Sequence, residues 1–221
     1  MIKLEYTSVL NFEGAVRAMR NPMNSWEKSD SFIGCGIHDH YPYCGESCKE
    51  ACHFVAGEND LKLMKKLAKA GSDHRKFMRQ IFVSVDITAP LYWWKEFDTY
   101  KVGTVANSTS TMHTIHKKEF ELDDISTDHL SEWGKYVLDT VIDFLELCRI
   151  EFNETKDKTA WYDIISLLPS GYLQKRTVTM NYENLVKMYH ARKNHKLDEW
   201  HEFCDWIKEL PYSEIITGVK E

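Results

Sequence analysis

A run of hydroxyl side chains between Asn107 and His113 is the first feature that could bind a ligand. Residues 108–111 read Ser-Thr-Ser-Thr, and Lys101 lies a few residues upstream. Hydroxyls and loop amides beside one or two cations form a natural cradle for a phosphate or another anion. The same composition suits a solvated polar turn, and only Gly103 interrupts it where a glycine-rich phosphate loop would have several glycines. The run therefore predicts either an anion site or an exposed turn.

Residues 35–53 concentrate potential metal ligands, with four cysteines and three histidines in nineteen positions. Cys44, Cys48 and Cys52 recur every four residues, which would put them on one face of a helix. Cys35 and the histidines could complete a tetrahedral zinc site. The spacing lacks the Cys-x2-Cys pairs of common zinc modules, and cysteine is also a frequent core residue. A metal site and a buried cysteine face both stay open, and we assign no residue to a metal.

Positive side chains gather between residues 175 and 196, in a segment that also carries a helical pattern. If residues 181–192 form a helix, Tyr189, Arg192 and His195 share one face, about a turn apart. Cations that face the same way could bind an anion together. Cations near a helix C-terminus are also favoured by the helix dipole alone, so this pattern too has two interpretations.

Periodic apolar residues predict the elements that must position these side chains. Alternating Ile and Val at 81, 83, 85 and 87 predict a half-buried strand over 79–88. Pro90 stands where a proline opens a helix, so we expect the hydroxyl run where that helix ends. A stripe every three or four residues predicts one long amphipathic helix of about 20 residues, formed by Leu130, Trp133, Val137, Val141, Phe144 and Cys148. The other expected elements are a strand at 2–9 and helices at 12–21, 59–70, 160–169, 182–192 and 198–210.

Length, composition and charge limit the class of protein. The 221 residues suit one domain, or one domain with an insertion, and 43% hydrophobic residues with seven Trp supply a core. A net charge of -6 argues against a partner that is a nucleic acid polymer. No apolar run approaches the roughly 20 residues of a membrane span. The first residues lack the pattern of a signal peptide, so we expect a cytoplasmic protein whose cysteines are thiols or metal ligands.

Several segments together resemble the flavin-dependent thymidylate synthases. GAVRAMRN at 14–21 is similar to the family's opening motif, and 71–97 is similar to its central Gly-His motif, strand, Ala-Pro and aromatic helix. Residues 168–192, LPSGYLQKRTVTMNYENLVKMYHAR, resemble its Leu-Pro…Thr-x-Asn…Leu…Arg segment without a gap. DEWHEFCDWIKEL at 198–210 takes the place of its closing helix. These collinear blocks, with the segments between them, occupy over half of the chain.

The loop after the aromatic helix departs from the family pattern. Where the family has Arg-His-Arg-x-x-Ser, residues 99–104 read Thr-Tyr-Lys-Val-Gly-Thr, and where it has Ser-x-Arg-Tyr, residues 109–112 read Thr-Ser-Thr-Met. Three arginines are therefore absent. Glu96 replaces a family glutamine, and Lys187 replaces a flavin-contacting asparagine. Each charged bond to a phosphate that is lost in this way costs roughly 1–3 kcal/mol of dianion binding, unless the binding mode changes.

The resemblance implies a fold, an assembly and an activity. The fold would be α+β, a mixed sheet flanked by helices, with a Cys/His-containing insertion near 31–55 and residues 1–221 in a single domain. The assembly would be a homotetramer with active sites between subunits. The activity would be methylation or another modification of a pyrimidine deoxynucleotide, dUMP to dTMP, with reduced FAD, NADPH and methylenetetrahydrofolate. Because the flavin supplies the hydride and no protein nucleophile is needed, we assign no catalytic residue.

The resemblance also implies which residues touch the ligands. FAD would be contacted by His74, Lys101, Thr104 and Asn181. The nucleotide would be contacted by Glu96, Ser108, Ser110, His113, Lys175 and Arg192. Two alternatives to an enzyme of this kind are a non-catalytic descendant that binds a nucleotide or serves as a scaffold, and a metal-dependent protein built on the Cys/His segment.

Overall fold

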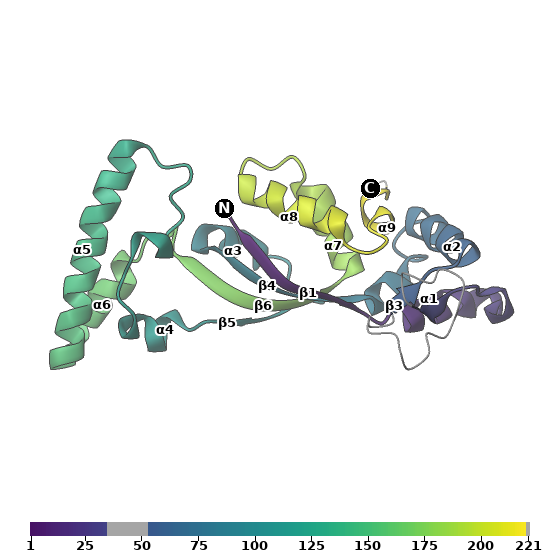
Figure 1. The fold of residues 1–221 in the computed structure, drawn as a ribbon, viewed down its shortest axis with the longest axis horizontal. Coiled ribbons are helices and arrows are strands. Elements are labelled where there is room, and N and C mark those ends of the chain that lie inside the picture. The colour runs from purple at the N-terminus through teal and green to yellow at the C-terminus, as the bar shows by residue number, and fades with distance from the viewer. Residues whose placement is uncertain (35–52, 220–221) are drawn as a thin grey trace.

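A four-stranded sheet with the strand order β1-β4-β6-β5 forms the centre of the protein (Figure 1). The computed structural model describes residues 1–34 and 53–219. The strands of this sheet are β1 Lys3–Leu10, β4 Phe82–Pro90, β5 Val105–Ser108 and β6 Leu173–Asn181. A separate pair consists of β2 Phe32–Gly34 and β3 His53–Val55. The segment with Cys35, Cys44, Cys48 and Cys52 lies outside the described residues.

Helices occupy one face and both ends of the sheet (Figure 1). The α-helices are α1 Phe12–Arg20, α2 Glu58–Lys69, α3 Leu91–Phe97, α4 Thr111–Thr114, α5 Glu132–Thr155, α6 Lys158–Leu167, α7 Tyr182–Arg192, α8 Asp198–Glu209 and α9 Glu214–Thr217. Short 3-10 helices are η1 Asn21–Met23, η2 Trp26–Lys28, η3 Lys76–Gln80, η4 Ile115–Lys117 and η5 Leu122–Asp124. The predicted α+β class is confirmed. The pairings between the described strands are all antiparallel, so the sheet is not mixed, because β6 runs opposite to both of its neighbours.

The alternation in β4 explains which face of the sheet is covered. Ile81, Val83, Val85 and Ile87 are all buried, as the sequence predicts. They pack under α3, α7 and α8, where Trp93, Trp94, Trp200 and Phe203 form the largest part of the aromatic core. The intervening positions of β4 lie on the opposite face, which no described helix covers in Figure 1. The sheet therefore has one apolar face and one open polar face.

A second apolar core lies between α5 and α6, beyond one end of the sheet (Figure 1). The long helix is confirmed, but the predicted stripe is only partly buried: Cys148 lies in the core and Val141 packs against it. Trp133 and Val137 are 80% and 59% exposed, whereas the buried positions include Leu138 and Leu145. The helix carries apolar residues on two sides, and periodicity alone does not show which side meets α6. The exposed side remains available for another contact.

A buried ion pair fixes the connection between α1 and α2. Arg20 Nε lies 2.6 Å from Asp60 Oδ1, and the two side chains are 4% and 0% exposed. The second oxygen, Asp60 Oδ2, accepts bonds from two hydroxyls and two backbone amides: Ser29 Oγ, Ser31 Oγ, Asp30 N and Ser31 N. Burial on its own raises the pKa of Asp60, but these hydrogen bonds and Arg20 outweigh it and hold the pKa below its usual range. The loop from Ser29 to Ser31 is thus anchored on one carboxylate.

Two predicted boundaries differ from the structure. The helix α2 begins at Glu58, one residue before the expected start at 59, and its N-cap is Gly57. The aromatic helix α3 ends at Phe97, so the hydroxyl run does not begin at its C-terminus. All seven residues from 98 to 104 form turns and loop, and Asn107 and Ser108 then pair with β6. The run is part of a strand and the turn that follows it.

Candidate functional site

Glu96 and Arg192, both implied as nucleotide contacts, bind each other. Arg192 Nη1 lies 2.9 Å from Glu96 Oε2, and the indole Nε1 of Trp200 donates to the same oxygen at 2.7 Å. The imidazole Nε2 of His195 is 3.4 Å from that oxygen. Glu96 comes from α3, Arg192 from the end of α7 and Trp200 from α8, so three helices of one face meet at this carboxylate. We call these four residues and Tyr100 the Glu96 cluster.

Aromatic rings hold the guanidinium of Arg192 in place. Its Nε donates to the hydroxyl of Tyr100 at 2.9 Å. The guanidinium carbon lies 4.7 Å from the ring centre of Trp200 and 5.5 Å from that of Tyr100. Cation–π contacts of this kind favour a fixed orientation of the planar group. The side chain of Arg192 is still 18% exposed and that of Glu96 is 35% exposed, so a ligand can reach the pair.

A shallow hollow of about 400 Å³ adjoins the Glu96 cluster through Tyr100. Its lining residues are Phe97, Asp98, Tyr100, Lys101, Thr104 and Ala106. Lys101 is exposed and forms no ion pair with the described part of the chain. Thr104 donates its hydroxyl to the backbone oxygen of Tyr100, which shapes the turn at the edge of the hollow. Two of the four residues implied for FAD therefore lie next to the implied nucleotide pair.

The first turn of α7 lies against the loop that carries Lys101. Asn181 caps the helix by accepting from Asn184 N at 3.0 Å, and the Asn184 side chain closes a capping box with Asn181 N at 3.2 Å. Asn184 Nδ2 also donates to the backbone oxygen of Val102 at 2.6 Å. Asn181, the third residue implied for FAD, is thus a structural cap in this chain, with its side-chain oxygen already bonded.

His74 is the fourth residue implied for FAD. Its neighbour Arg75 contacts the first turn of α7. Arg75 Nε lies 2.8 Å from Glu183 Oε2, and both side chains are less than a tenth exposed. This pair joins the segment before β4 to the first turn of α7. His74 itself is exposed. Asn181 pairs with Phe82, the first residue of β4, and His74 lies in the segment before that strand. His74 and Asn181 are therefore both at the end of the sheet where β4 begins.

Gly103 tests how closely the loop that carries Lys101 must approach the first turn of α7. Its φ of 78° lies in the left-handed region, and an added Cβ would come within 2.9 Å of Asn184 Oδ1. We expect Gly103→Ala to lower the free energy of unfolding by about 1–2 kcal/mol, through backbone strain and displacement of the capping asparagine. Gly71→Ala is the matched control, because its φ is 106° but nothing lies within 4 Å of the added Cβ. Urea denaturation should show the larger loss for Gly103→Ala, and equal losses would mean that the close approach is unimportant.

Lys175 lies away from these residues, on the open face of the sheet. Its Nζ is 3.0 Å from Asp86 Oδ2 and 3.7 Å from Glu5 Oε2, and it lies 5.4 Å from the ring centre of Tyr6. The hydrogen bond to Asp86 raises the pKa of Lys175. Its neighbour Arg176 lies on the covered face instead, stacked on Trp94 at 4.2 Å. Alternation along β6 thus separates Lys175 from the Glu96 cluster within one chain.

The hydroxyl run lies at the surface, and the hydroxyls of Thr109 and Ser110 bond to backbone atoms. Ser108 is the last residue of β5 and pairs with Arg176 across the sheet. Ser110 caps the short helix α4 by accepting from His113 N at 3.0 Å. Ser108, Ser110 and His113 are all exposed. Their arrangement in one chain is that of a solvated turn, and they do not meet Glu96 or Arg192 there.

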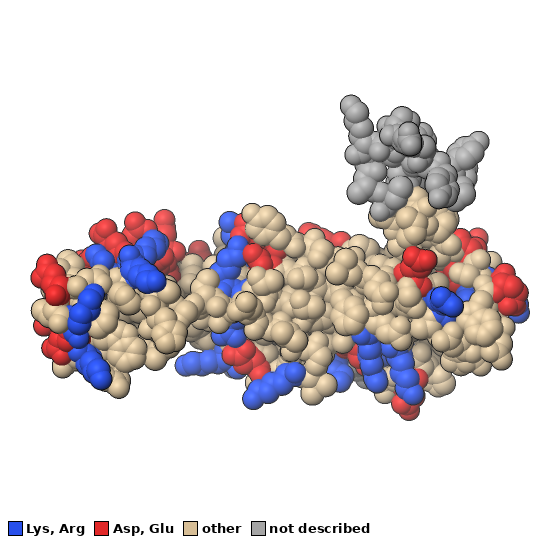
Figure 2. All heavy atoms as spheres, turned by 90° about the horizontal axis from the view of Figure 1, so that it is seen from below, with Lys and Arg blue, Asp and Glu red and all other residues tan. Residues whose placement is uncertain are grey.

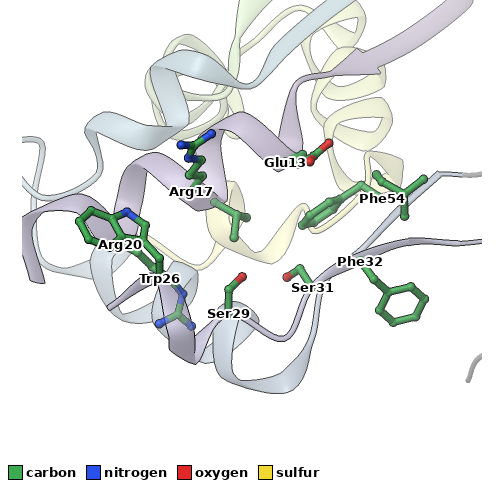
Figure 3. A pocket seen from close by; sticks show the side chains of 10 residues that line it. Glu13, Arg17, Arg20, Trp26, Ser29, Ser31, Phe32 and Phe54 are labelled. Carbon is green, nitrogen blue, oxygen red and sulfur yellow. The ribbon is translucent and has the colours of Figure 1, made fainter. Parts of the chain in front are cut away.

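A separate pocket of about 480 Å³ lies beside α1 at the far end of the sheet (Figure 3). Trp26 stands on one side of it and Phe32 and Phe54 on the other, with two serines between them (Figure 3). Those serine hydroxyls, Ser29 and Ser31, are bonded to Asp60. None of the residues that the resemblance implies as FAD or nucleotide contacts lines this pocket.

On the face seen in Figure 2, charged side chains of both signs lie close together, and potential metal ligands do not gather in the described chain. Figure 2 shows Lys and Arg interspersed with Asp and Glu on the face in view. Within residues 1–34 and 53–219, no group of three or more His, Cys, Asp or Glu side chains could hold a metal ion. Within the same ranges, no helix combines the length and apolar character that crossing a membrane requires.

Three residues of the Glu96 cluster are not among the ligand contacts that the resemblance implies, although His195 stands out in the sequence as a possible anion-binding cation. Tyr100, His195 and Trp200 contact the implied nucleotide residues directly. Trp200 was recognisable only as part of the closing helix, and Tyr100 only as a departure from the arginine motif. The expected shared face of Tyr189, Arg192 and His195 fails because α7 ends at Arg192. A turn then brings His195 back over Glu96.

The fold of the chain is similar to that of solved flavin-dependent thymidylate synthases. Thymidylate synthase X from Helicobacter pylori, crystallised with FAD and dUMP, aligns over 99% of this chain and 98% of its own, with a TM-score of 0.64 and 16% identity. A second structure of flavin-dependent thymidylate synthase ThyX from Helicobacter pylori, complexed with FAD and dUMP, aligns over 99% of both chains with the same TM-score and identity. No family model and no curated protein sequence matches the chain. The resemblance seen in the sequence is therefore confirmed at the level of the fold.

Proposed function

We propose that this protein is a flavin-dependent thymidylate synthase-like enzyme that binds FAD and a pyrimidine deoxynucleotide. The observation that carries the proposal is the full-length likeness to synthases crystallised with FAD and dUMP. The Glu96 cluster and the hollow with Lys101 supply a cation, aromatic surfaces and an accessible arginine on the face where α3, α7 and α8 meet. The proposed reaction converts dUMP to dTMP, with NADPH and methylenetetrahydrofolate as co-substrates and FAD as the cofactor.

The residues near the start of α7 fit part of an FAD molecule. Lys101 and His74 are both exposed, so a ligand can reach them. The cation of Lys101 could bind one phosphate of the cofactor, and His74 could donate to another group. When bound, the flavin would supply the hydride, while the chain's own groups orient and polarise the nucleotide. We propose Lys101, Thr104, His74 and Asn181 as its contacts.

The remaining proposed nucleotide contacts need a second subunit. Lys175, Ser108, Ser110 and His113 do not face Glu96 and Arg192 within one chain. A homotetramer with sites between subunits would bring the open sheet face or the α4 turn of one protomer to the Glu96 cluster of another. The exposed apolar side of α5 supports such an assembly, because an extended apolar patch on a surface usually marks a contact. That the whole chain forms one domain and works in the cytoplasm is part of the same proposal.

A non-catalytic descendant of the same fold is the second candidate. Two observations favour it: Arg192 is already paired with Glu96, and the capping oxygen of Asn181 is already bonded. In this case the scaffold would bind a nucleotide weakly, or bind none. The two candidates make different predictions for the purified protein. The enzyme should bind a flavin and a nucleotide in one coupled site, and the non-catalytic descendant should not.

An absorbance spectrum across the near-ultraviolet and visible flavin bands tests the proposal. We expect the purified protein to show bound flavin, or to bind added FAD, and expect dUMP to shift the flavin bands. A shift requires that the two ligands occupy one coupled site. A tetramer that stays colourless with FAD and is unaffected by dUMP would favour the non-catalytic descendant.

A further inference from the structure

Glu96 presents a negative charge to Arg192, the arginine that the resemblance implies as a nucleotide contact. Two donors, Arg192 Nη1 and Trp200 Nε1, bind the single oxygen Glu96 Oε2 at 2.9 and 2.7 Å. Arg192 Nε is bonded to Tyr100 at 2.9 Å. Each of the two hydrogen-bonding edges of the guanidinium therefore has one nitrogen engaged already, Nε by the phenol and Nη1 by the carboxylate. Arg192 is the side chain that an anion should find most readily, yet two of its three nitrogens already have partners within the cluster.

The pair is close enough to solvent for an anion to compete with it. With 35% of Glu96 and 18% of Arg192 exposed, a ligand in the adjoining hollow can approach the guanidinium. A phosphate bound there would lie near the Glu96 carboxylate, because both would contact the same planar group. Two anions at one arginine repel each other and divide its hydrogen bonds. Binding would therefore require Glu96 to release Arg192 or to share it.

We propose that Glu96 is an intramolecular counter-ion that sets the affinity of this site for phosphate-bearing ligands. The inference rests on the proposed function in taking a pyrimidine nucleotide as the ligand. Glu96 lowers the affinity for the phosphate group by holding Arg192, and it leaves the affinity for an uncharged nucleoside unchanged. It is a specificity-determining residue that works through Arg192, and this chain has a carboxylate where the resembling family has a neutral amide.

Glu96→Gln is the variant that isolates the charge. The glutamine oxygen can still accept from Arg192 and Trp200, so the packing of the three helices is retained. We expect isothermal titration calorimetry to show at least tenfold tighter binding of dUMP, a factor that corresponds to about 1.4 kcal/mol. Binding of deoxyuridine should not change. Asp205→Asn is the matched control, since it removes one carboxylate from α8 that pairs with Lys208 on the surface. It should leave the affinity for dUMP unchanged.

Unchanged or weaker dUMP binding by Glu96→Gln, in a variant that melts normally, would overturn the inference. Weaker binding would mean that the Glu96 carboxylate itself accepts a bond from the ligand. Equal gains for dUMP and deoxyuridine would also overturn it, because the effect would then not depend on phosphate.

A second probe decides the matter if neither the original protein nor the variant binds dUMP, an outcome that would refute the proposed function alone. Inorganic phosphate is then titrated while the indole N–H resonance of Trp200 is followed by NMR, with Trp200→Phe used for assignment. We expect the resonance to respond at lower phosphate concentrations in Glu96→Gln than in the original protein. Equal midpoints, or no response in either protein, would overturn the inference.

Discussion

Asp60→Asn is expected to lower the free energy of unfolding by about 3–5 kcal/mol, the range for breaking one partner of a buried ion pair. The substitution leaves the guanidinium of Arg20 charged while it is only 4% exposed. It also weakens the bonds by which Asp60 Oδ2 holds the loop from Ser29 to Ser31. Chemical denaturation at neutral pH measures the loss. Most of it should appear as a shift in midpoint, because the native fold is otherwise unchanged.

The same pair should make stability depend on pH in a defined direction. Because the pKa of Asp60 is lowered on folding, the carboxylate stabilises the fold above its ordinary value of 3.8, and this stabilisation is lost as the pH falls through the folded value. The difference between the original protein and Asp60→Asn should therefore shrink below about pH 4. Glu58→Gln, an exposed change on the same helix, should cost less than about 1 kcal/mol at any pH. A similar loss for both variants would show that the Arg20–Asp60 pair contributes little.

Strands and helices with one buried side were predictable from the sequence. The alternation from Ile81 to Ile87 and the closing helix with Trp200, Phe203, Cys204 and Ile207 are both confirmed, since each has apolar residues on a single face. The prediction failed where two faces are apolar. Trp133 and Val137 of α5 are exposed, and the pattern could not reveal that α6 covers the other side.

The candidate site was predictable in part, and only through the resemblance. The sequence pointed to Glu96 and Arg192 as neighbours of one ligand, and the structure brings them together at 2.9 Å. Their mutual pairing was not predictable, because 95 residues of chain separate them and no local pattern links them. Lys175 is separated from Glu96 and Arg192 because side chains alternate along β6. The sequence showed a family motif in this segment but did not predict a strand there.

The hydroxyl run shows why composition alone was insufficient. A cradle for an anion and a solvated turn use the same residue types, and the difference lies in what the hydroxyls contact. Ser110 caps α4, and Thr109 N donates to the backbone of Lys175 at 2.9 Å. Within the described chain, the run therefore serves local structure first. Its role toward a nucleotide depends on the proposed neighbouring subunit.

Arg192→Gln is expected to weaken the binding of dUMP by about 1.5–3 kcal/mol, the range for a lost hydrogen bond to a charged group. Two effects add here. The phosphate loses its guanidinium partner, and the Glu96 carboxylate loses the charge that neutralises it. Calorimetric titration of dUMP measures the change, and a fluorescence melt should confirm that the core around Trp200 is intact. Arg192→Lys should recover only part of the affinity, because an ammonium lacks the planar fork and its stacking on Trp200 at 4.7 Å.

Combining Arg192→Gln with Glu96→Gln separates the two effects. With Arg192 present, Glu96→Gln removes both the competition for the guanidinium and the repulsion of the phosphate. With Arg192 absent, only the repulsion remains to be relieved, so the gain in dUMP affinity should be smaller. The difference between the two gains is the coupling energy of the pair toward the ligand. Equal gains in both backgrounds would mean that Glu96 acts on the nucleotide directly, and no effect of Arg192→Gln on dUMP binding would remove this arginine from the proposed site.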